Sequence, residues 1–154
     1  HIRDMENTFK KELKKYPDWH QSVELLQTIP GIGPNAAAIF LTETKDLNGF
    51  GVSRQLTAYS GIAPAPYSSG SSVHRNASIS KIGDPRLRQA FYMAALSATR
   101  LKNSPYYDFY RRLREKGKPA KVALIAVARK LMVLCFSIMK SRKPYDPAYR
   151  AASI

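Results

Sequence analysis

The sequence predicts an all-α domain, and three features indicate it. Apolar residues recur at spacings of three and four in successive segments, as in helices that bury one face. Asp-Pro and Ser-Pro pairs, which favour helix starts, precede two of these segments. No segment shows the alternation of apolar and polar residues that is typical of a half-buried strand. With 154 residues, 44% of them hydrophobic, the chain is long enough for one ordinary core.

The first predicted helix lies within residues 1–19. An apolar stripe at helical spacing defines it: Ile2, Met5, Phe9, Leu13 and Tyr16. We expect Pro17 and Asp18 to end it. Two interpretations stay open, because such a helix either ends a coiled coil leading to a further domain or packs on the adjacent core. We assign residues 1–19 as a helical linker or coiled-coil end.

A second helix, beginning near Trp19, leads into a stretch that resembles a helix-hairpin-helix motif, residues 25–44. Its turn places Gly31 and Gly33 where tight geometry favours glycine, and Pro34 suits the first position of the next helix. Amides at that helix start can hold a phosphate, so we predict Gly31 and Gly33 as nucleic-acid-binding residues. The alternative is a compact turn, followed by alanines that allow close helix packing.

A short helix over Arg54–Tyr59 is predicted next. Ser53 is the expected N-cap, and Gly61 is expected to end the helix. Beyond it, Pro64 and Pro66 disfavour helix at themselves and at the preceding residues, so this part of the chain is expected to be extended.

Two helices with similar start signals follow. Asp84 is a good N-cap and Pro85 a good first residue for a helix extending to Arg100. A Ser-Pro pair repeats that signal before a helix over Tyr106–Lys116, and Gly117 is expected to stop it.

The last predicted helix, Ala120–Lys140, is apolar around most of its circumference and is therefore expected to be the central core helix. Arg129 and Lys130 interrupt its apolar run, which argues against a membrane span. The lone Cys135 in this run excludes an internal disulfide and fits a reducing cytoplasm. We assign residues 20–141 to one helical domain and residues 142–154 to a surface tail.

The charge distribution favours a polyanionic partner. Residues 1–66 hold 7 Lys/Arg and 7 Asp/Glu, whereas residues 67–154 hold 18 and 4, so the second part carries the whole net charge of +14. A solvated protein face normally mixes both signs. Nucleic acid is the preferred partner, ahead of an acidic membrane surface or an acidic protein.

A polar loop and the cations after it, residues 67–88, are the main candidate site. A stretch so rich in serine around a single glycine cannot pack as a core element, so it is expected on the surface, where functional loops lie. Its cations predict an anionic ligand: Arg75, Lys81, Arg86 and Arg88. The alternative is ordinary loop composition.

A second basic region lies in the predicted helix Tyr106–Lys116. Tyrosines and arginines occur close together there, which suits stacking on bases and contacts to a nucleic-acid backbone, so Arg111 and Arg112 are predicted to bind nucleic acid. The alternative places the tyrosines in the core and the arginines on a solvated face.

These motifs occur in a specific order: IPGIGPNAAAIFLTE, then FGVSRQLTAYSGIAPAP, then SSG, then ISKIGDPRLRQAFYMAA. In that order they resemble the C-terminal transposase domain of the insertion-sequence one-ten/one-sixteen family, which includes pilin-gene invertases. The resemblance covers roughly residues 20–135.

The resemblance implies a DNA recombinase that attacks a DNA phosphate with a serine and forms a phosphoserine–DNA intermediate. The family's Ser-Gly motif falls on Ser69-Gly70, which makes Ser69 the catalytic candidate. Its basic positions fall on Arg75, Lys81 and Arg88. Ser68 is a neighbouring serine, so the assignment depends on Gly70 as the register.

The resemblance also implies partners. It implies an acidic nuclease-like domain before this one that holds a divalent metal such as Mg²⁺, a structured guide RNA, homo-oligomers and action on DNA in the cytoplasm. No metal ligand is predicted within these 154 residues. The main alternative is a non-catalytic helix-hairpin-helix module that binds DNA or RNA.

Overall fold

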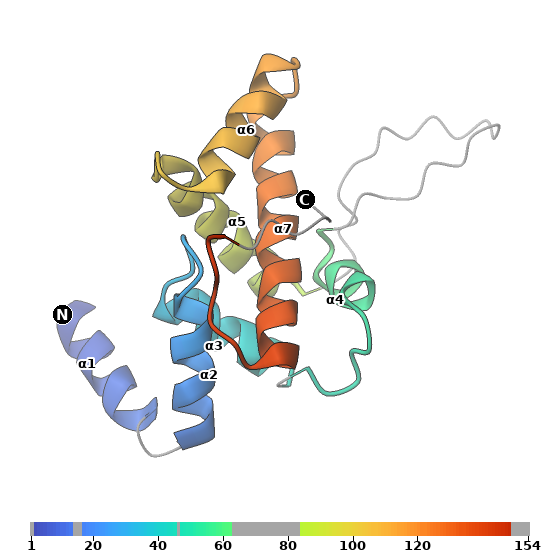
Figure 1. The fold of residues 1–154 in the computed structure, drawn as a ribbon. Helices are drawn as coiled ribbons and strands as arrows, with labels where there is room; N and C mark the ends of the chain where they lie inside the picture. The colour runs from blue at the N-terminus through green and yellow to red at the C-terminus, as the bar shows by residue number, and fades with distance from the viewer. Residues whose placement is uncertain (1, 14–16, 46, 63–83, 149–154) are drawn as a thin grey trace.

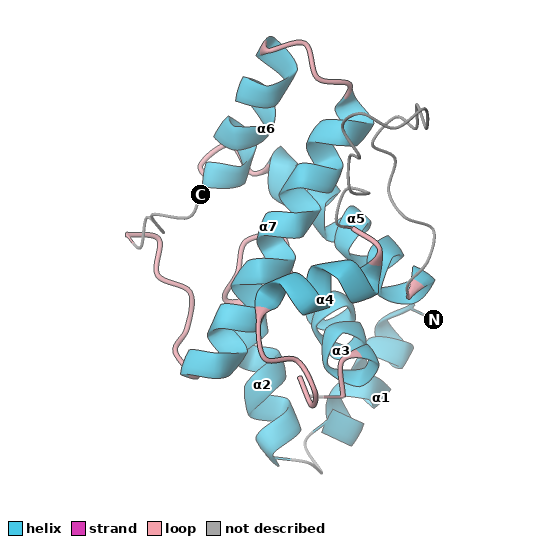
Figure 2. Cartoon of the chain, turned by 90° about the vertical axis from the view of Figure 1, so that its right-hand side faces the viewer, coloured by secondary structure: helices cyan, strands magenta, loops and turns pink. Residues whose placement is uncertain are grey.

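The computed structural model describes residues 2–13, 17–45, 47–62 and 84–148. These residues form seven helices and contain no strand, which confirms the all-α prediction (Figure 1, Figure 2). The helices are, in chain order, α1 (Ile2–Leu13), α2 (Pro17–Gln27), α3 (Pro34–Glu43), α4 (Ser53–Ser60), α5 (Pro85–Arg100), α6 (Pro105–Glu115) and α7 (Ala120–Ser141).

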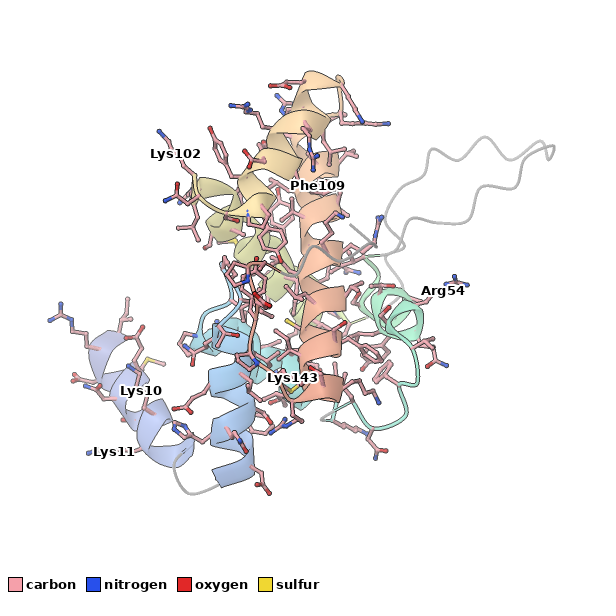
Figure 3. The ribbon with its side chains drawn as sticks, viewed as in Figure 1. Lys10, Lys11, Arg54, Lys102, Phe109 and Lys143 are labelled. Carbon is pink, nitrogen blue, oxygen red and sulfur yellow. The ribbon has the colours of Figure 1, made fainter. Side chains whose placement is uncertain are left out.

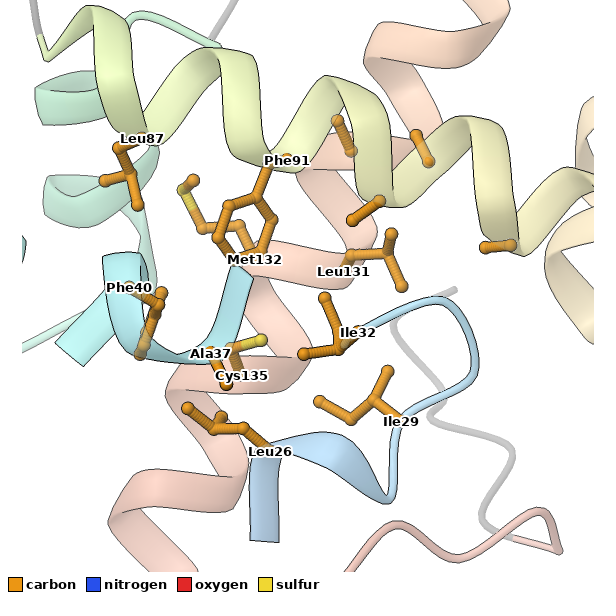
Figure 4. Close-up of a cluster of buried hydrophobic side chains, with 14 of the residues drawn as sticks. Leu26, Ile29, Ile32, Ala37, Phe40, Leu87, Phe91, Leu131, Met132 and Cys135 are labelled. Carbon is orange, nitrogen blue, oxygen red and sulfur yellow. The ribbon is translucent and has the colours of Figure 1, made fainter. Parts of the chain in front are cut away.

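Helix α7 is the centre of the described structure, as the sequence predicted. It contacts α2, α4, α5 and α6, and its longest shared surface is with α5 (Figure 1). Leu131, Met132 and Cys135 are fully buried against side chains of α2, α3 and α5 (Figure 4). Length and apolar composition alone would allow α7 to span a membrane, but most of its apolar stretch is buried inside the protein. Its composition is therefore explained by its place in the core.

The turn between α2 and α3 lies close to α5. Gly31 has a φ of +93°, and a Cβ built on it would lie 2.7 Å from the Cβ of Ala98 and 2.8 Å from the carbonyl oxygen of Ala94. Gly33, the N-cap of α3, has φ −89° and nothing within 4 Å of a Cβ built on it. Gly31 therefore allows the turn to pack directly on the α5 backbone, whereas Gly33 has no such packing role.

Most predicted helix ends are confirmed. The Asp84 carboxylate accepts hydrogen bonds from the amides of Arg86 (2.9 Å) and Leu87 (3.2 Å) at the start of α5. Gly61 ends α4 in the left-handed region, with φ +75°. Ser104 caps α6 as expected, since its hydroxyl accepts from the Tyr106 amide at 3.1 Å.

Two predicted boundaries are wrong. The helix α4 begins at Ser53 instead of being capped by it, because the Gln55 side chain accepts hydrogen bonds from the amides of Gly51 (2.7 Å) and Val52 (3.3 Å). The second helix, expected to begin near Trp19, begins at Pro17. Proline fits there because the first helical position has no intrahelical use for an amide hydrogen.

The two ends of the described chain pack differently. Helix α1 contacts α2 alone among the described elements (Figure 1). Its residues Ile2 and Met5 are exposed. After α7, Tyr145 packs against the core and its amide donates to the Thr28 hydroxyl at 2.8 Å. The chain after α7 therefore folds back against the end of α2.

Candidate nucleic-acid interface

The candidate interface combines predicted residues that the structure describes with others that it does not. Ser69, Gly70, Arg75 and Lys81 lie outside the described residues. The described residues do show where the chain lies directly before and directly after residues 63–83.

Both ends of residues 63–83 are held at the C-terminal end of α4. Before the segment, the Ile62 carbonyl accepts a hydrogen bond from Nη2 of Arg129 on α7, at 3.4 Å. After it, the Asp84 amide donates to the Tyr59 carbonyl at 3.1 Å. Ile62 is fully buried. Ile62 and Asp84, which flank the segment that contains Ser69, are therefore both held at one place, between α4, α5 and α7.

A small charged cluster lies where the segment returns. Arg86 Nη1 contacts Glu43 Oε1 at 3.4 Å, and Asp84 lies beside them. A side-chain hydrogen bond with Asp84 raises the pKa of Glu43, and burial adds to the effect. Burial also acts to raise the pKa of Asp84, but hydrogen bonds from Glu43, Leu87 and Arg86 outweigh it and lower that pKa. Of this pair, Asp84 therefore keeps its charge more readily, which suits its role as a helix cap.

Arg86 and Arg88, both predicted to bind nucleic acid, differ in how open they are to a ligand. Arg86 already has a carboxylate partner, although its side chain is 77% exposed and the contact is open to solvent. Arg88, one turn of helix inside α5, is half-buried. Both cations lie on the first turns of α5, directly after the anchored segment, as the sequence implied.

The end of the molecule formed by α6 and α7 is a second cationic surface, which we call the α6–α7 tip. It comprises exposed cations of the last turns of α6, the connecting turn and the first turn of α7: Arg111, Arg112, Arg114, Lys116, Lys118 and Lys121. Arg111 pairs with Glu115 at 3.4 Å, and Arg114 Nη1 donates to the Lys118 carbonyl at 2.9 Å, which closes the turn. The tip projects from the top of the molecule in Figure 1.

The tyrosines of α6 do not all serve this surface. Tyr106 is only 3% exposed and belongs to the core, and burial raises the pKa of its hydroxyl. Tyr107 and Tyr110 are half-buried. Tyr106 therefore lies in the core, as the alternative interpretation of the sequence proposed.

Sequence reasoning missed part of the cationic surface. Lys118 and Lys121 were not singled out because they lie beyond the predicted end of the tyrosine-rich helix. Arg129 and Lys130 were considered only as interruptions of an apolar run. Two adjacent cations inside a predicted core helix could have indicated a functional site, since ionised side chains are seldom buried unless they have a partner.

The described residues offer no metal centre. They contain no group of three or more His, Cys, Asp or Glu side chains placed to hold a metal ion. Cys135 is fully buried, and burial raises the pKa of its thiol, so it is a core residue and not a nucleophile.

An all-α domain with its charge excess on one part of the chain, and with an anchored segment beside exposed cations, is typical of a nucleic-acid-binding domain. Residues 23–111 match the model of the transposase IS116/IS110/IS902 family. The chain belongs to that family.

Relatives of this chain include proteins that invert genes. It is 32% identical over 130 residues to the pilin gene-inverting protein of Moraxella bovis, an alignment that covers 84% of this chain and 40% of that protein. It is 28% identical over 149 residues to the insertion element IS116 uncharacterized 44.8 kDa protein of Streptomyces clavuligerus, which covers 95% of this chain and 34% of the relative. The chain thus spans well under half the length of these relatives.

Proposed function

We propose that this chain is the DNA-contacting domain of a transposase or site-specific recombinase, and that Ser69 is its nucleophile. Family membership supports action on DNA, and two relatives carry names that describe inversion of a pilin gene. The observation that carries the proposal is that Ile62 and Asp84, on either side of residues 63–83, are both held at one place, next to exposed cations such as Arg54 on α4 and Arg86 on α5.

The proposed reaction conserves phosphate esters. The Ser69 hydroxyl oxygen attacks a DNA phosphorus, an Oγ–P bond forms, and the bond from phosphorus to one deoxyribose oxygen breaks. The serine proton ends on the released deoxyribose hydroxyl. The hydroxyl of another strand then reverses these steps, which joins that strand and restores serine. Because one ester replaces another, strand exchange needs no external energy source.

Arginine side chains would stabilise the charge that develops on the phosphoryl oxygens. We assign this role to Arg88, which lies on α5 among the described residues, and to Arg75, which lies outside them. A divalent metal such as Mg²⁺ would further polarise the phosphate. The described residues contain no group of His, Cys, Asp or Glu side chains placed to hold such a metal. The family resemblance is the reason to propose that a preceding domain holds it. The proposal also includes a structured guide RNA, homo-oligomers and action in the cytoplasm.

A second candidate function is a non-catalytic nucleic-acid-binding module. The α6–α7 tip favours it, because exposed cations there suffice for backbone contacts without any chemistry. The turn at Gly31 and Gly33 remains part of both proposals as a phosphate contact through the amides at the start of α3.

Strand exchange by the full-length protein separates the two candidates. The assay measures recombination between two cognate DNA sites for wild type, Ser69→Ala, and the matched controls Ser68→Ala and Ser71→Ala. We expect Ser69→Ala to lose recombination and keep DNA affinity, since one hydroxyl contributes little beside many phosphate contacts. Recombination at wild-type level by Ser69→Ala would refute the catalytic role. Loss in Ser68→Ala alone would move the nucleophile by one residue.

A further inference from the structure

A group of cations around one aromatic ring joins α6 to the middle of α7. Lys130 Nζ lies 4.3 Å from the centre of the Phe109 ring, and Arg112 Cζ lies 6.0 Å from the same centre. Phe109 is half-buried between α6 and α7, where Figure 3 labels it. The ring thus brings two cations from different helices to one place.

Arg129 precedes Lys130 on α7, and its side chain reaches the chain directly before residues 63–83. Its Nη2 donates to the Ile62 carbonyl at 3.4 Å, a long hydrogen bond, while its Nε is buried and has no hydrogen-bond partner. The side chain is half-buried. A guanidinium has five N–H donors, so Arg129 keeps donors available while it holds the start of residues 63–83.

Within the described part of the chain, no ion pair joins a carboxylate to any of these three cations, Arg112, Arg129 and Lys130. Burial lowers the pKa of Lys130, and the charges of Arg112 and Arg129 lower it further. Burial also lowers the pKa of Arg129. Partly desolvated like charges that lie together are costly, and a bound anion relieves that cost.

We propose that Arg112, Arg129 and Lys130 form a binding site for a backbone phosphate of duplex DNA, beside the point where residues 63–83 leave α4. The inference rests on the proposed function and adds residues to it. Arginine suits phosphate because its planar donors match two phosphoryl oxygens, and Lys130 supplies a further point charge. A phosphate held here is adjacent to the anchor of the segment that contains Ser69, so Arg129 positions the DNA backbone relative to that segment.

The salt dependence of duplex DNA binding tests the site. Each phosphate contact contributes about 0.9 to the slope of log affinity against log salt concentration. We expect Arg129→Gln/Lys130→Gln to reduce the slope by about one to two units. Lys102→Gln is the matched control, because Lys102 is exposed at the turn between α5 and α6, away from Phe109 (Figure 3). It should leave the slope unchanged.

A second pair of substitutions guards against a purely structural effect. Arg129 also holds the Ile62 carbonyl, so its replacement can loosen the fold, which thermal unfolding would reveal. Arg112→Gln/Lys130→Gln leaves that hydrogen bond intact and should reduce the slope by a similar amount. A wild-type slope in this second pair overturns the site. Salt-independent binding by the wild type would instead overturn the proposed function.

The same titration with duplex RNA of matched sequence addresses the ligand. We expect the substitutions to change the slope for DNA more than the slope for RNA. A larger loss for RNA would overturn the assignment to DNA.

Discussion

Replacing Gly31 by alanine tests how the turn between α2 and α3 is built. A left-handed φ costs a non-glycine residue about 1–2 kcal/mol. The new Cβ would also lie 2.7 Å from the Ala98 Cβ and 2.8 Å from the Ala94 carbonyl oxygen. Relieving such overpacking costs about 1–3 kcal/mol. Together these effects predict a loss of about 2–5 kcal/mol, or about 4–20 °C in Tm for a domain of this size.

Gly33→Ala is the matched control, because Gly33 has a permitted φ and open space where a Cβ would lie. Chemical denaturation followed by circular dichroism gives both free energies of unfolding. We expect Gly33→Ala to change stability by less than about 1 kcal/mol, since glycine is only modestly favoured as an N-cap. Equal stability of the two variants would refute the packing role of Gly31.

Three further substitutions test the core and a helix cap. Leu131→Asp should lower the free energy of unfolding by several kcal/mol, because an unpaired carboxylate would replace a fully buried side chain. Val133→Asp should lower it less, because Val133 is half-buried. Equal losses of stability in thermal melts would contradict the orientation of α7. Asp84→Ala should cost about 1 kcal/mol at neutral pH. Folding lowers the pKa of Asp84 from 3.8, so the stabilisation by its carboxylate is complete above pH 3.8 and is lost as the pH falls through the pKa of the folded state. If Asp84→Ala destabilises the protein as much at pH 2 as at neutral pH, the carboxylate is not the cap.

Local signals in the sequence were sufficient to predict most of the fold. Asp84-Pro85 and the Ser-Pro pair before α6 mark helix starts because capping and proline geometry act between neighbouring residues. The apolar run of α7 likewise predicted a central helix. It did not show which side faces the core, since apolar residues cover most of its circumference and only packing distinguishes buried Leu131 from half-buried Val133.

The candidate site was less predictable, because its geometry depends on contacts between distant residues. Arg129 lies 67 positions from Ile62 in the chain, and no local pattern indicates that they meet. The close approach of Gly31 to Ala98 was also not predictable, since the sequence indicates a tight turn but not which helix packs against it. Gln55 replaced Ser53 in stabilising the start of α4 because its longer side chain reaches two amides.

The nucleophile can be identified most directly by trapping it. Full-length protein is incubated with its cognate DNA, guide RNA and Mg²⁺, the complex is digested with nuclease and protease, and mass spectrometry locates the residue that carries the nucleotide adduct. We expect a phosphodiester on the Ser69 side chain, with no adduct in Ser69→Ala and retained adducts in Ser68→Ala and Ser71→Ala. An adduct on another residue, or one that persists in Ser69→Ala, would contradict the assignment of Ser69 as the nucleophile.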